Sequence, residues 1–449
     1  MAKKKAATGK AKRAKAKKVR RTRAKEIGEK VAKKKKSPSS LSSNLSSLAT
    51  KINARSEKDY GYDVADQSYS DITDWITTTC TPLDVTLWGG YPRGRVIEIH
   101  GDPSVGKSTA LEAAFAGNQR VAGECVLLMS ESCIDRNRMV REGIDMSRIL
   151  FVEGNTVEDN IIYIYDVLRH RETRDPDWCK AHPMILGWDT PSNSQERAKW
   201  DDPDKEYTGG MASKARTVRD ALRTITPLAG RLNVSVFLLL QVHQKIGSIY
   251  AGKDTDCGGG PKFNASLRIN ARQKDKIESD DPLMVGIVSE FTIYKSKAGC
   301  PPFRKCDVVI RSMTGIDNDM SMFLYLRGVP LCDPCPTCGG KIATVDAKGQ
   351  RVWSSMLWKT CPVCNGTGLV YRLFAKGATT NIGLEGKNEK GDKTQWRYIL
   401  GWPQEPNIAF REDELRKILD ARPGLRTWMA QQCWSQCTKP EPPLIHPVE

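Results

Sequence analysis

The sequence lacks an apolar run long enough to cross a membrane, a secretory signal and internal repeats. Nothing in the sequence therefore indicates that its 14 cysteines are in an oxidising compartment, where disulfides form. We expect an intracellular protein with free thiols, located in a bacterial cytoplasm or nucleoid or in a eukaryotic nucleus. We expect no contact with a membrane.

The excess of positive charge is confined to one end of the chain. Residues 1–36 contain 18 Lys or Arg and two Glu, a net charge of +16, whereas the remaining residues carry a net charge of only +1. This tail has almost no large apolar residues, so we expect it to be disordered. Its charge favours non-specific contact with phosphate backbones, although a solubility or nuclear-targeting tail has the same composition.

Changes in composition divide the 449 residues into five regions. The Lys/Arg-rich tail over 1–40 is followed by a linker with a candidate oligomerisation segment over 41–75. A core over 76–328 comes next, then a module rich in Cys, Gly and Pro over 329–372. A C-terminal region over 373–449 completes the chain.

Short apolar strands alternate with amphipathic helices through the core, which predicts the α/β class with a mostly parallel sheet flanked by helices. The strands are expected at 95–100, 124–130, 148–152, 183–188 and 234–240, and the helices at 109–120, 157–171 and 211–230. Further strands near 265–271, 287–294 and 307–311 are joined by shorter links, which allows antiparallel pairing.

A complete phosphate-binding loop pattern lies between the first strand and the first helix of the core. Glycine, four residues, then Gly-Lys-Ser presents backbone N–H groups and a helix N-terminus to a polyphosphate. An ordinary glycine turn is the alternative. The predicted ATP-binding residues are Gly101, Asp102, Pro103, Ser104, Val105, Gly106, Lys107, Ser108 and Thr109, with Lys107 reaching the β- and γ-phosphates.

Polar residues follow three of the predicted strands. Asp189 ends an apolar strand, and we expect it to hold Mg²⁺ together with Ser108; a helix N-cap is the alternative for Asp189. Glu131 and Gln241 each follow an apolar strand in the same way. A carboxylate there can activate water, and an amide can hydrogen-bond the γ-phosphate or the water.

Two Cys-x-x-Cys pairs with 22 residues between them predict a zinc ribbon in the module after the core. The expected ligands of this structural Zn²⁺ are Cys335, Cys338, Cys361 and Cys364. Cys332 lies three residues before the first pair and is a competing ligand. Reduced, unliganded thiols are the alternative.

These patterns together resemble the RecA recombinase family, and the phage UvsX-type branch in particular. The likeness runs from about Pro82 to Asp317 and includes Trp88-Gly-Gly-Tyr-Pro-Arg-Gly before the phosphate loop and the segment Ser130–Asp135. It implies a RecA-like P-loop ATPase core. It also implies that Glu131 is the water-activating base, that Gln241 senses the γ-phosphate and that Asp135 contacts adenine.

The resemblance extends to segments that would contact DNA and a neighbouring subunit. Lys295 and Lys297 resemble the paired lysines that reach the ATP of the next subunit, although exposed strand edges are also rich in Lys. Residues 196–211 correspond to the first DNA-binding loop, which is unusually acidic here. The second loop supplies the predicted DNA-binding residues Gly258, Gly259, Gly260, Lys262 and Phe263.

The leading functional prediction is an ATP-dependent DNA recombinase and repair protein. It would bind single- and double-stranded DNA, assemble as a helical filament and promote strand exchange with DNA-dependent ATP hydrolysis, using ATP, Mg²⁺ and structural Zn²⁺. One alternative is a hexameric helicase or branch-migration motor of the same fold, assembled as a ring. The other is a non-enzymatic DNA-packaging or nucleoid protein.

Overall fold

The computed structural model describes most of the core and parts of the C-terminal half. The described residues are 72–130, 134–202, 210–244, 253–255, 257–328, 332–334, 343–345, 351–353, 369–371, 396–402, 404–411, 414–435 and 437. The chain divides into two units, Met1–Asp71 and Ile72–Glu449. The predicted tail and residues 41–71 of the predicted linker fall in the first unit, outside the described residues. Residues 72–75 of that linker belong to the second unit, where Trp75 begins a strand.

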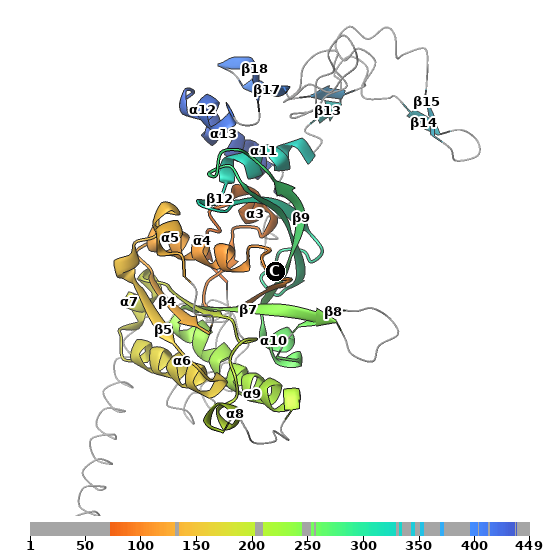
Figure 1. Ribbon diagram of the computed structural model, residues 1–449. Coiled ribbons are helices and arrows are strands. Elements are labelled where there is room, and N and C mark those ends of the chain that lie inside the picture. The colour runs from red at the N-terminus through yellow and green to blue at the C-terminus, as the bar shows by residue number, and fades with distance from the viewer. Residues whose placement is uncertain are drawn as a thin grey trace, which may run out of the picture. The chain divides into compact units, whose positions relative to one another are not determined.

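A ten-stranded sheet forms the centre of the second unit (Figure 1). Its order is β12-β11-β10-β9-β3-β7-β6-β4-β5, with β8 paired to β7. The strands are β3 (Val96–Gly101), β4 (Glu124–Met129), β5 (Ile149–Glu153), β6 (Met184–Asp189), β7 (Val234–Gln244), β8 (Lys253–Thr255), β9 (Leu267–Ile277), β10 (Gly286–Ser296), β11 (Lys305–Arg311) and β12 (Gly315–Ile316).

The pairing confirms the mostly parallel sheet with an antiparallel extension. The strands from β9 to β5 in this order run parallel, whereas β10, β11 and β12 are added antiparallel. All the strands predicted in the core are present. The strand β7 continues to Gln244, so Gln241 lies within it and not after it.

Helices cover both faces of the sheet, with α4 on one side and α6 and α9 on the other in Figure 1. The helices of the core are α3 (Thr81–Thr86), α4 (Lys107–Gln119), α5 (Arg136–Arg141), the 3₁₀ helix η1 (Met146–Arg148), α6 (Val157–Glu172), α7 (Pro176–Ala181), α8 (Arg197–Asp201), α9 (Gly210–Leu232), α10 (Gly259–Asn264) and α11 (Asn318–Gly328). A small antiparallel pair, β1 (Trp75–Ile76) with β2 (Tyr91–Pro92), lies beside α4.

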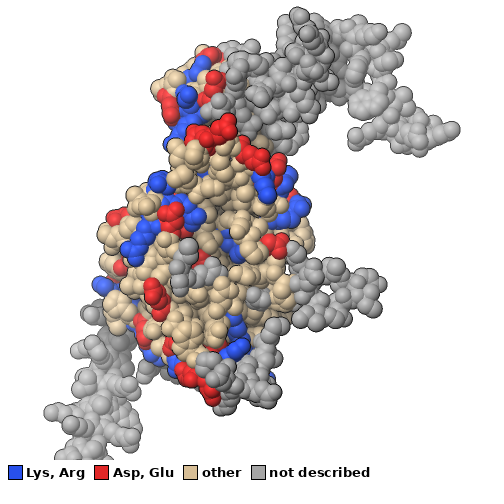
Figure 2. Space-filling view, viewed as in Figure 1, with Lys and Arg blue, Asp and Glu red and all other residues tan. Residues whose placement is uncertain are grey.

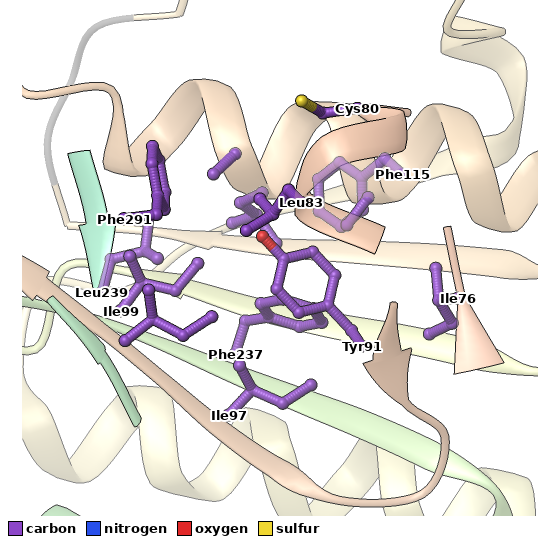
Figure 3. Close-up of a cluster of buried hydrophobic side chains, with 14 of the residues drawn as sticks. Ile76, Cys80, Leu83, Tyr91, Ile97, Ile99, Phe115, Phe237, Leu239 and Phe291 are labelled. Atoms are coloured by element: carbon purple, nitrogen blue, oxygen red, sulfur yellow. The ribbon is translucent and has the colours of Figure 1, made fainter. Parts of the chain in front are cut away.

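Alternate residues of the central strands enter two separate hydrophobic cores, as the period of a strand requires. Phe237 and Leu239 of β7 pack with α3 and α4, and Figure 3 shows Phe237 against Tyr91, with ring centroids 5.0 Å apart. Val236 and Leu238 face the opposite core with α6 and α9. The sheet is therefore buried on both faces, which explains the continuous apolar runs in the sequence.

The C-terminal region packs on the antiparallel end of the sheet. A third core joins α3, β11 and α11 to later elements, among them Trp402 and Leu419. These elements are β17 (Trp396–Trp402), β18 (Glu405–Arg411), α12 (Leu415–Asp420) and α13 (Leu425–Ser435). In the Cys-rich module the structure describes two strand pairs, β13 (Cys332–Pro334) with β16 (Leu369–Tyr371) and β14 (Ala343–Val345) with β15 (Arg351–Trp353).

The surface of the described residues agrees with the near-neutral charge of the chain outside the tail. On the face drawn in Figure 2, groups of Lys and Arg and groups of Asp and Glu are both scattered among other residues. Within the part of the chain that the structure covers, we find no helix with the length and apolar character that a membrane span needs.

Candidate nucleotide-binding and catalytic site

The phosphate-binding loop lies at the carboxyl end of the central strand β3. The strand ends at Gly101, and α4 begins at Lys107 after a turn in which Gly106 adopts a left-handed backbone with φ 90°. This left-handed backbone favours glycine, and a Cβ here would also lie 2.2 Å from Ile310 Cδ1, which would have to move. The predicted strand, turn and helix are all present, and the N-terminus of α4 opens at the turn.

The Lys107 ammonium is held inside the loop. Its Nζ donates hydrogen bonds to the carbonyl oxygens of Gly101, at 3.0 Å, and Asp102, at 2.7 Å. These carbonyls lie at the start of the turn, so the positive charge is placed where a bound phosphate would accept from both the lysine and the backbone N–H groups.

Ser108 and Asp189 meet although they are 81 positions apart in the sequence. Ser108 Oγ donates to Asp189 Oδ2 at 2.6 Å. Asp189 is the last residue of β6, and the next helix, α8, is capped by Glu196, so Asp189 is not the N-cap that the alternative interpretation required. A hydroxyl and a carboxylate are oxygen ligands suited to Mg²⁺.

No cluster of three or more His, Cys, Asp or Glu side chains that could hold a metal is found among the described residues. A magnesium site of the kind expected here does not need one, because Mg²⁺ is often bound by one or two carboxylates together with the phosphates of a nucleotide. The pair Ser108 and Asp189 therefore fits a nucleotide-bound Mg²⁺.

Gln241 lies beside the phosphate-binding loop. In the pairing of β3 with β7 it stands opposite Gly101, and its backbone N–H donates to Ser192 Oγ at 3.2 Å. The sheet thus brings Gly101, Gln241 and Asp189 to one edge, as the predicted parallel order required. Glu131 lies outside the described residues, but the residue before it, Ser130, donates its backbone N–H to the Asp189 carbonyl at 2.9 Å.

Asp135 has a structural partner of its own. It caps α5, and its Oδ1 accepts from the backbone N–H of Arg138 at 2.9 Å. The contact with adenine that the family resemblance implies stays a prediction.

Sequence reasoning missed a buried ionic cluster beside the loop helix. Arg138 of α5 donates to both carboxylate oxygens of Glu112 on α4, at 2.6 and 2.5 Å, and lies 3.5 Å from Glu142 Oε1. The Glu142 side chain is only 4% exposed. Burial, and then the negative charge of Glu112, raises the pKa of Glu142 to about 8 against the pull of Arg138. The available signal was an isolated Glu112 within an apolar helix.

This cluster predicts a stability that falls as the pH rises. The folded protein binds the Glu142 proton more tightly than the unfolded chain, whose pKa is about 4.5. The stabilisation that proton binding by Glu142 gives is therefore complete below the unfolded pKa, and it is lost as the pH rises through about 8. We expect the free energy of unfolding to drop by on the order of 1 to 3 kcal/mol between pH 6 and pH 8.5.

Thermal unfolding followed across this pH range measures the effect. The variant Glu142→Gln carries no titrating proton and should show a flatter profile. The exposed residue Glu153, at the end of β5, gives the matched control Glu153→Gln, which should keep the profile of the unmodified chain. Equal profiles for the unmodified chain and Glu142→Gln would contradict the assignment.

Lys295 lies on β10 and reaches the predicted DNA-binding segment of its own chain. Its Nζ donates to the carbonyl oxygens of Lys262, at 2.7 Å, and Phe263, at 3.0 Å. Burial, and then the charges of Lys297 and Arg268, lowers the pKa of Lys295. β10 pairs with β9 as far as Ser296 but with β11 only as far as Thr292, so one side of the strand is unpaired at Lys295, and Lys297 lies just after the strand. The strand-edge interpretation of these lysines therefore stays open. Their reach to a neighbouring subunit stays a prediction.

The predicted second DNA-binding loop is partly helical. Gly259, Gly260, Lys262 and Phe263 lie in α10, with Gly258 as its N-cap at φ 64°. A Cβ at Gly260 would lie 2.8 Å from the Arg219 backbone, so this glycine is needed to pack α10 on α9. Phe263 is 77% exposed. The structure therefore leaves Phe263 at the surface and gives Gly260 a packing role that the sequence did not reveal.

Several predicted residues fall outside the described part of the chain. Residues 203–209 of the first predicted DNA-binding loop do so, whereas residues 197–201 form α8. The proposed zinc ligands Cys335, Cys338, Cys361 and Cys364 also lie outside it. The described strands β13 and β16 pair the segment before the first cysteine pair with the segment after the second. The zinc ribbon stays a prediction.

Comparison with known proteins supports the fold. A family model, the RecA N-terminal domain, matches residues 45–175 and 201–317. The chain is similar to Protein RecA of Trichodesmium erythraeum, with 30% identity over 244 residues, covering 54% of this chain and 64% of the relative. Protein RecA of Ehrlichia canis is 27% identical over 247 residues, covering 55% and 65%. Protein RecA of Delftia acidovorans is 28% identical over 246 residues, covering 54% and 63%.

Each of these matches covers only part of this chain and only part of the relative. The chain spans 63 to 65% of the length of these three curated relatives. The matched part contains the phosphate-binding loop. Asp189, Ser192 and residues 196–200 of the first predicted DNA-binding loop fall between the two matched ranges of the family model.

Proposed function

The chain belongs to the RecA family, and from that premise we propose that it is a DNA-dependent ATPase acting in recombination and repair. It would bind single-stranded DNA, assemble with copies of itself into a filament and promote homologous strand exchange with double-stranded DNA. The observation that carries the proposal is the contact between Ser108 and Asp189 beside the phosphate-binding loop. It joins the loop helix to the end of a neighbouring strand in the arrangement that a Mg²⁺–nucleotide needs.

Phosphate binding would use the turn from Gly101 to Gly106 and the first residues of α4. The backbone N–H groups at the helix N-terminus favour negative charge. Lys107 now donates to two carbonyl oxygens of the turn. On nucleotide binding, Lys107 would exchange these acceptors for phosphate oxygens. Its ammonium would therefore be hydrogen-bonded both with and without nucleotide.

Ser108 Oγ and Asp189 Oδ2 would hold Mg²⁺ at the same edge. When bound, the ion would neutralise charge that develops on the transferred phosphoryl group. Asp189 would fix its position because it belongs to a buried strand, and Ser108 because it lies in the first turn of α4.

The water that attacks the phosphate would be activated by Glu131 and the γ-phosphate would be sensed by Gln241. Gln241 is supported by its place opposite Gly101 in the sheet. Glu131 is supported by Ser130, whose backbone is hydrogen-bonded to Asp189. Asp135 would contact adenine from the cap of α5.

Assembly would complete the site with Lys295 and Lys297 from a neighbouring subunit, which makes hydrolysis depend on the filament. Lys295 now donates to the carbonyls of Lys262 and Phe263. If the Lys295 side chain moved to a nucleotide, it would lose its hydrogen bonds to α10. The binding of nucleotide and the binding of DNA would then be coupled. Gly258, Gly259, Gly260, Lys262 and Phe263 would contact DNA through this segment.

The finer parts of the proposal rest on sequence patterns. These are the likeness to the phage UvsX-type branch, the structural Zn²⁺ site and the binding of the basic tail to DNA. The helicase and nucleoid-protein alternatives gain no support from the relatives, which are RecA proteins.

Two measurements test the proposed function. Phosphate release from ATP should rise when single-stranded DNA is added, and Glu131→Gln should abolish the rise while ATP binding remains. Electron microscopy with ATP and DNA should reveal open helical filaments. Closed rings would favour a helicase, and a chain without DNA-stimulated phosphate release would not be the proposed ATPase.

A further inference from the structure

The segment Thr190–Arg197 connects the end of β6 to α8, and buried hydrogen bonds tie it to the strand that leads to Glu131. The Oγ atoms of Ser194 and Ser130 lie 2.6 Å apart. Ser130 Oγ also accepts from the indole N–H of Trp188 at 3.2 Å and from Asn160 Nδ2 at 3.5 Å. Ser194 is 3% exposed and Asn160 is fully buried.

The same segment is tied to the strand that carries Gln241. Ser192 Oγ accepts from the Gln241 backbone N–H at 3.2 Å. Thr190 Oγ1 donates to the Leu239 carbonyl. The segment begins directly after Asp189. It therefore contacts Ser130, the residue after β4, on one side and Leu239 and Gln241 within β7 on the other.

A lysine from α9 fixes the middle of the segment. Lys214 Nζ donates to the carbonyl oxygens of Ser192, at 2.6 Å, and Ser194, at 2.8 Å. Hydrogen bonds from an ammonium are stronger than those between neutral groups. Lys214 lies near the start of α9, which begins at Gly210 in the region predicted to be the first DNA-binding loop.

We propose that Lys214 and Ser194 are positioning residues that couple the first DNA-binding region to the catalytic edge of the sheet. The proposal rests on the proposed function, because it concerns the DNA dependence of that ATPase. Movement at the start of α9 would be carried by Lys214 to the carbonyls of Ser192 and Ser194. From there it would reach Gln241 through Ser192 and the strand before Glu131 through Ser130.

Each step of the coupling is a hydrogen bond, and two of the groups involved, Ser194 and Asn160, are buried. Buried polar networks are rigid when they are satisfied and costly when one member is removed. Loss of Lys214 would leave two carbonyls of the segment without this donor, and loss of the Ser194 hydroxyl would separate the segment from Ser130.

The test compares phosphate release with and without single-stranded DNA in Lys214→Met and Ser194→Ala. Lys214→Met keeps most of the aliphatic stem and removes the ammonium. In both variants we expect the DNA-stimulated kcat to fall about tenfold, while the KM for ATP and the rate without DNA stay within about twofold. Lys214→Arg keeps a charged donor and should recover part of the stimulation.

Ser235→Ala is the matched control for removal of a buried serine hydroxyl. Ser235 lies at the opposite end of β7 and accepts from the Gly94 backbone N–H at 3.0 Å. It should lower the melting temperature as Ser194→Ala does, but leave the DNA-stimulated rate unchanged. Equal loss of both rates in Lys214→Met and Ser194→Ala would assign them a structural role only and overturn the proposal.

A double-mutant cycle with Ser130→Ala and Ser194→Ala tests the direct link between the two serines. The double variant should lose no more DNA stimulation than either single variant, because the same contact is removed each time. Additive losses would overturn the link. If the unmodified chain shows DNA-stimulated hydrolysis and the variants keep it, this inference fails alone; if the unmodified chain shows none, the proposed function fails and the inference with it.

Discussion

The Lys107→Ala variant should lose DNA-stimulated ATP hydrolysis by about a hundred- to a thousandfold, the typical cost of removing one preorganised charge stabiliser. The reason lies in the position of the ammonium, which is held inside the phosphate-binding loop, 3.0 Å from the Gly101 carbonyl and 2.7 Å from the Asp102 carbonyl. The kcat for phosphate release, measured with saturating single-stranded DNA, gives the effect directly.

The fold should survive this change. Lys107 opens α4, where alanine is a good helix former, so the melting temperature should stay close to that of the unmodified chain. Lys274→Ala is the matched control, because Lys274 lies on β9 and forms a half-exposed ion pair with Asp307. It should retain full activity. Hydrolysis by Lys107→Ala at the normal rate would refute the proposed site.

The second large effect is expected at a buried ion pair between the central strand and its neighbour. Arg268 Nε and Nη2 each donate to a carboxylate oxygen of Glu98 at 2.7 Å, and His100 Nδ1 lies 3.0 Å from Glu98 Oε1. Glu98 is fully buried. Arg268→Met leaves that carboxylate without its main partner, so the free energy of unfolding should fall by about 3 to 5 kcal/mol.

Chemical denaturation measures this loss, and the same strand supplies the control. Arg272 is also on β9 and pairs with Glu290 at 3.3 Å, but it is 59% exposed, so Arg272→Met should cost less than about 1 kcal/mol. Adding Glu98→Gln to Arg268→Met removes the stranded charge and should restore part of the loss. A small effect of Arg268→Met would mean that the ion pair does not support the strand.

The pH dependence of this pair has the opposite sign to that of Glu142. Burial alone would raise the pKa of Glu98, but the contacts with His100 and Arg268 outweigh it and hold this pKa below its usual value. The stabilisation is therefore present above the unfolded pKa of about 4.5 and is lost as the pH falls through the folded pKa. Arg268→Met should reduce the dependence of the free energy of unfolding on pH in this acid range.

Local sequence patterns were sufficient to predict those features whose residues are close together in the chain. The turn from Gly101 to Lys107 is one such case, because its glycine, its lysine and the helix that follows are adjacent in the chain. The apolar runs of β3, β4, β6 and β7 are another, since strands buried on both faces have few polar residues. Asp189 could be recognised because it ends one of these runs.

Groups that pair across the fold were harder to recognise. Glu98 and Arg268 each interrupt an apolar strand, and that interruption is a signal of a cross-strand pair, but only the parallel register of β3 with β9 makes them partners. Lys214 gave no signal at all, since most lysines of a helix are exposed to solvent. Its role follows from the path of the segment after β6.

The sequence by itself determined the phosphate-binding turn, the class of the fold and the acidic residue at the end of β6, because each depends on periodicity or on residues close together in the chain. The tertiary structure alone decided which distant groups meet: Ser108 with Asp189, Arg138 with Glu112, and Lys295 with the carbonyls of α10. Such contacts depend on strand order and on how helices pack on the sheet. These are settled by the burial of the whole core, so no local stretch of residues encodes them.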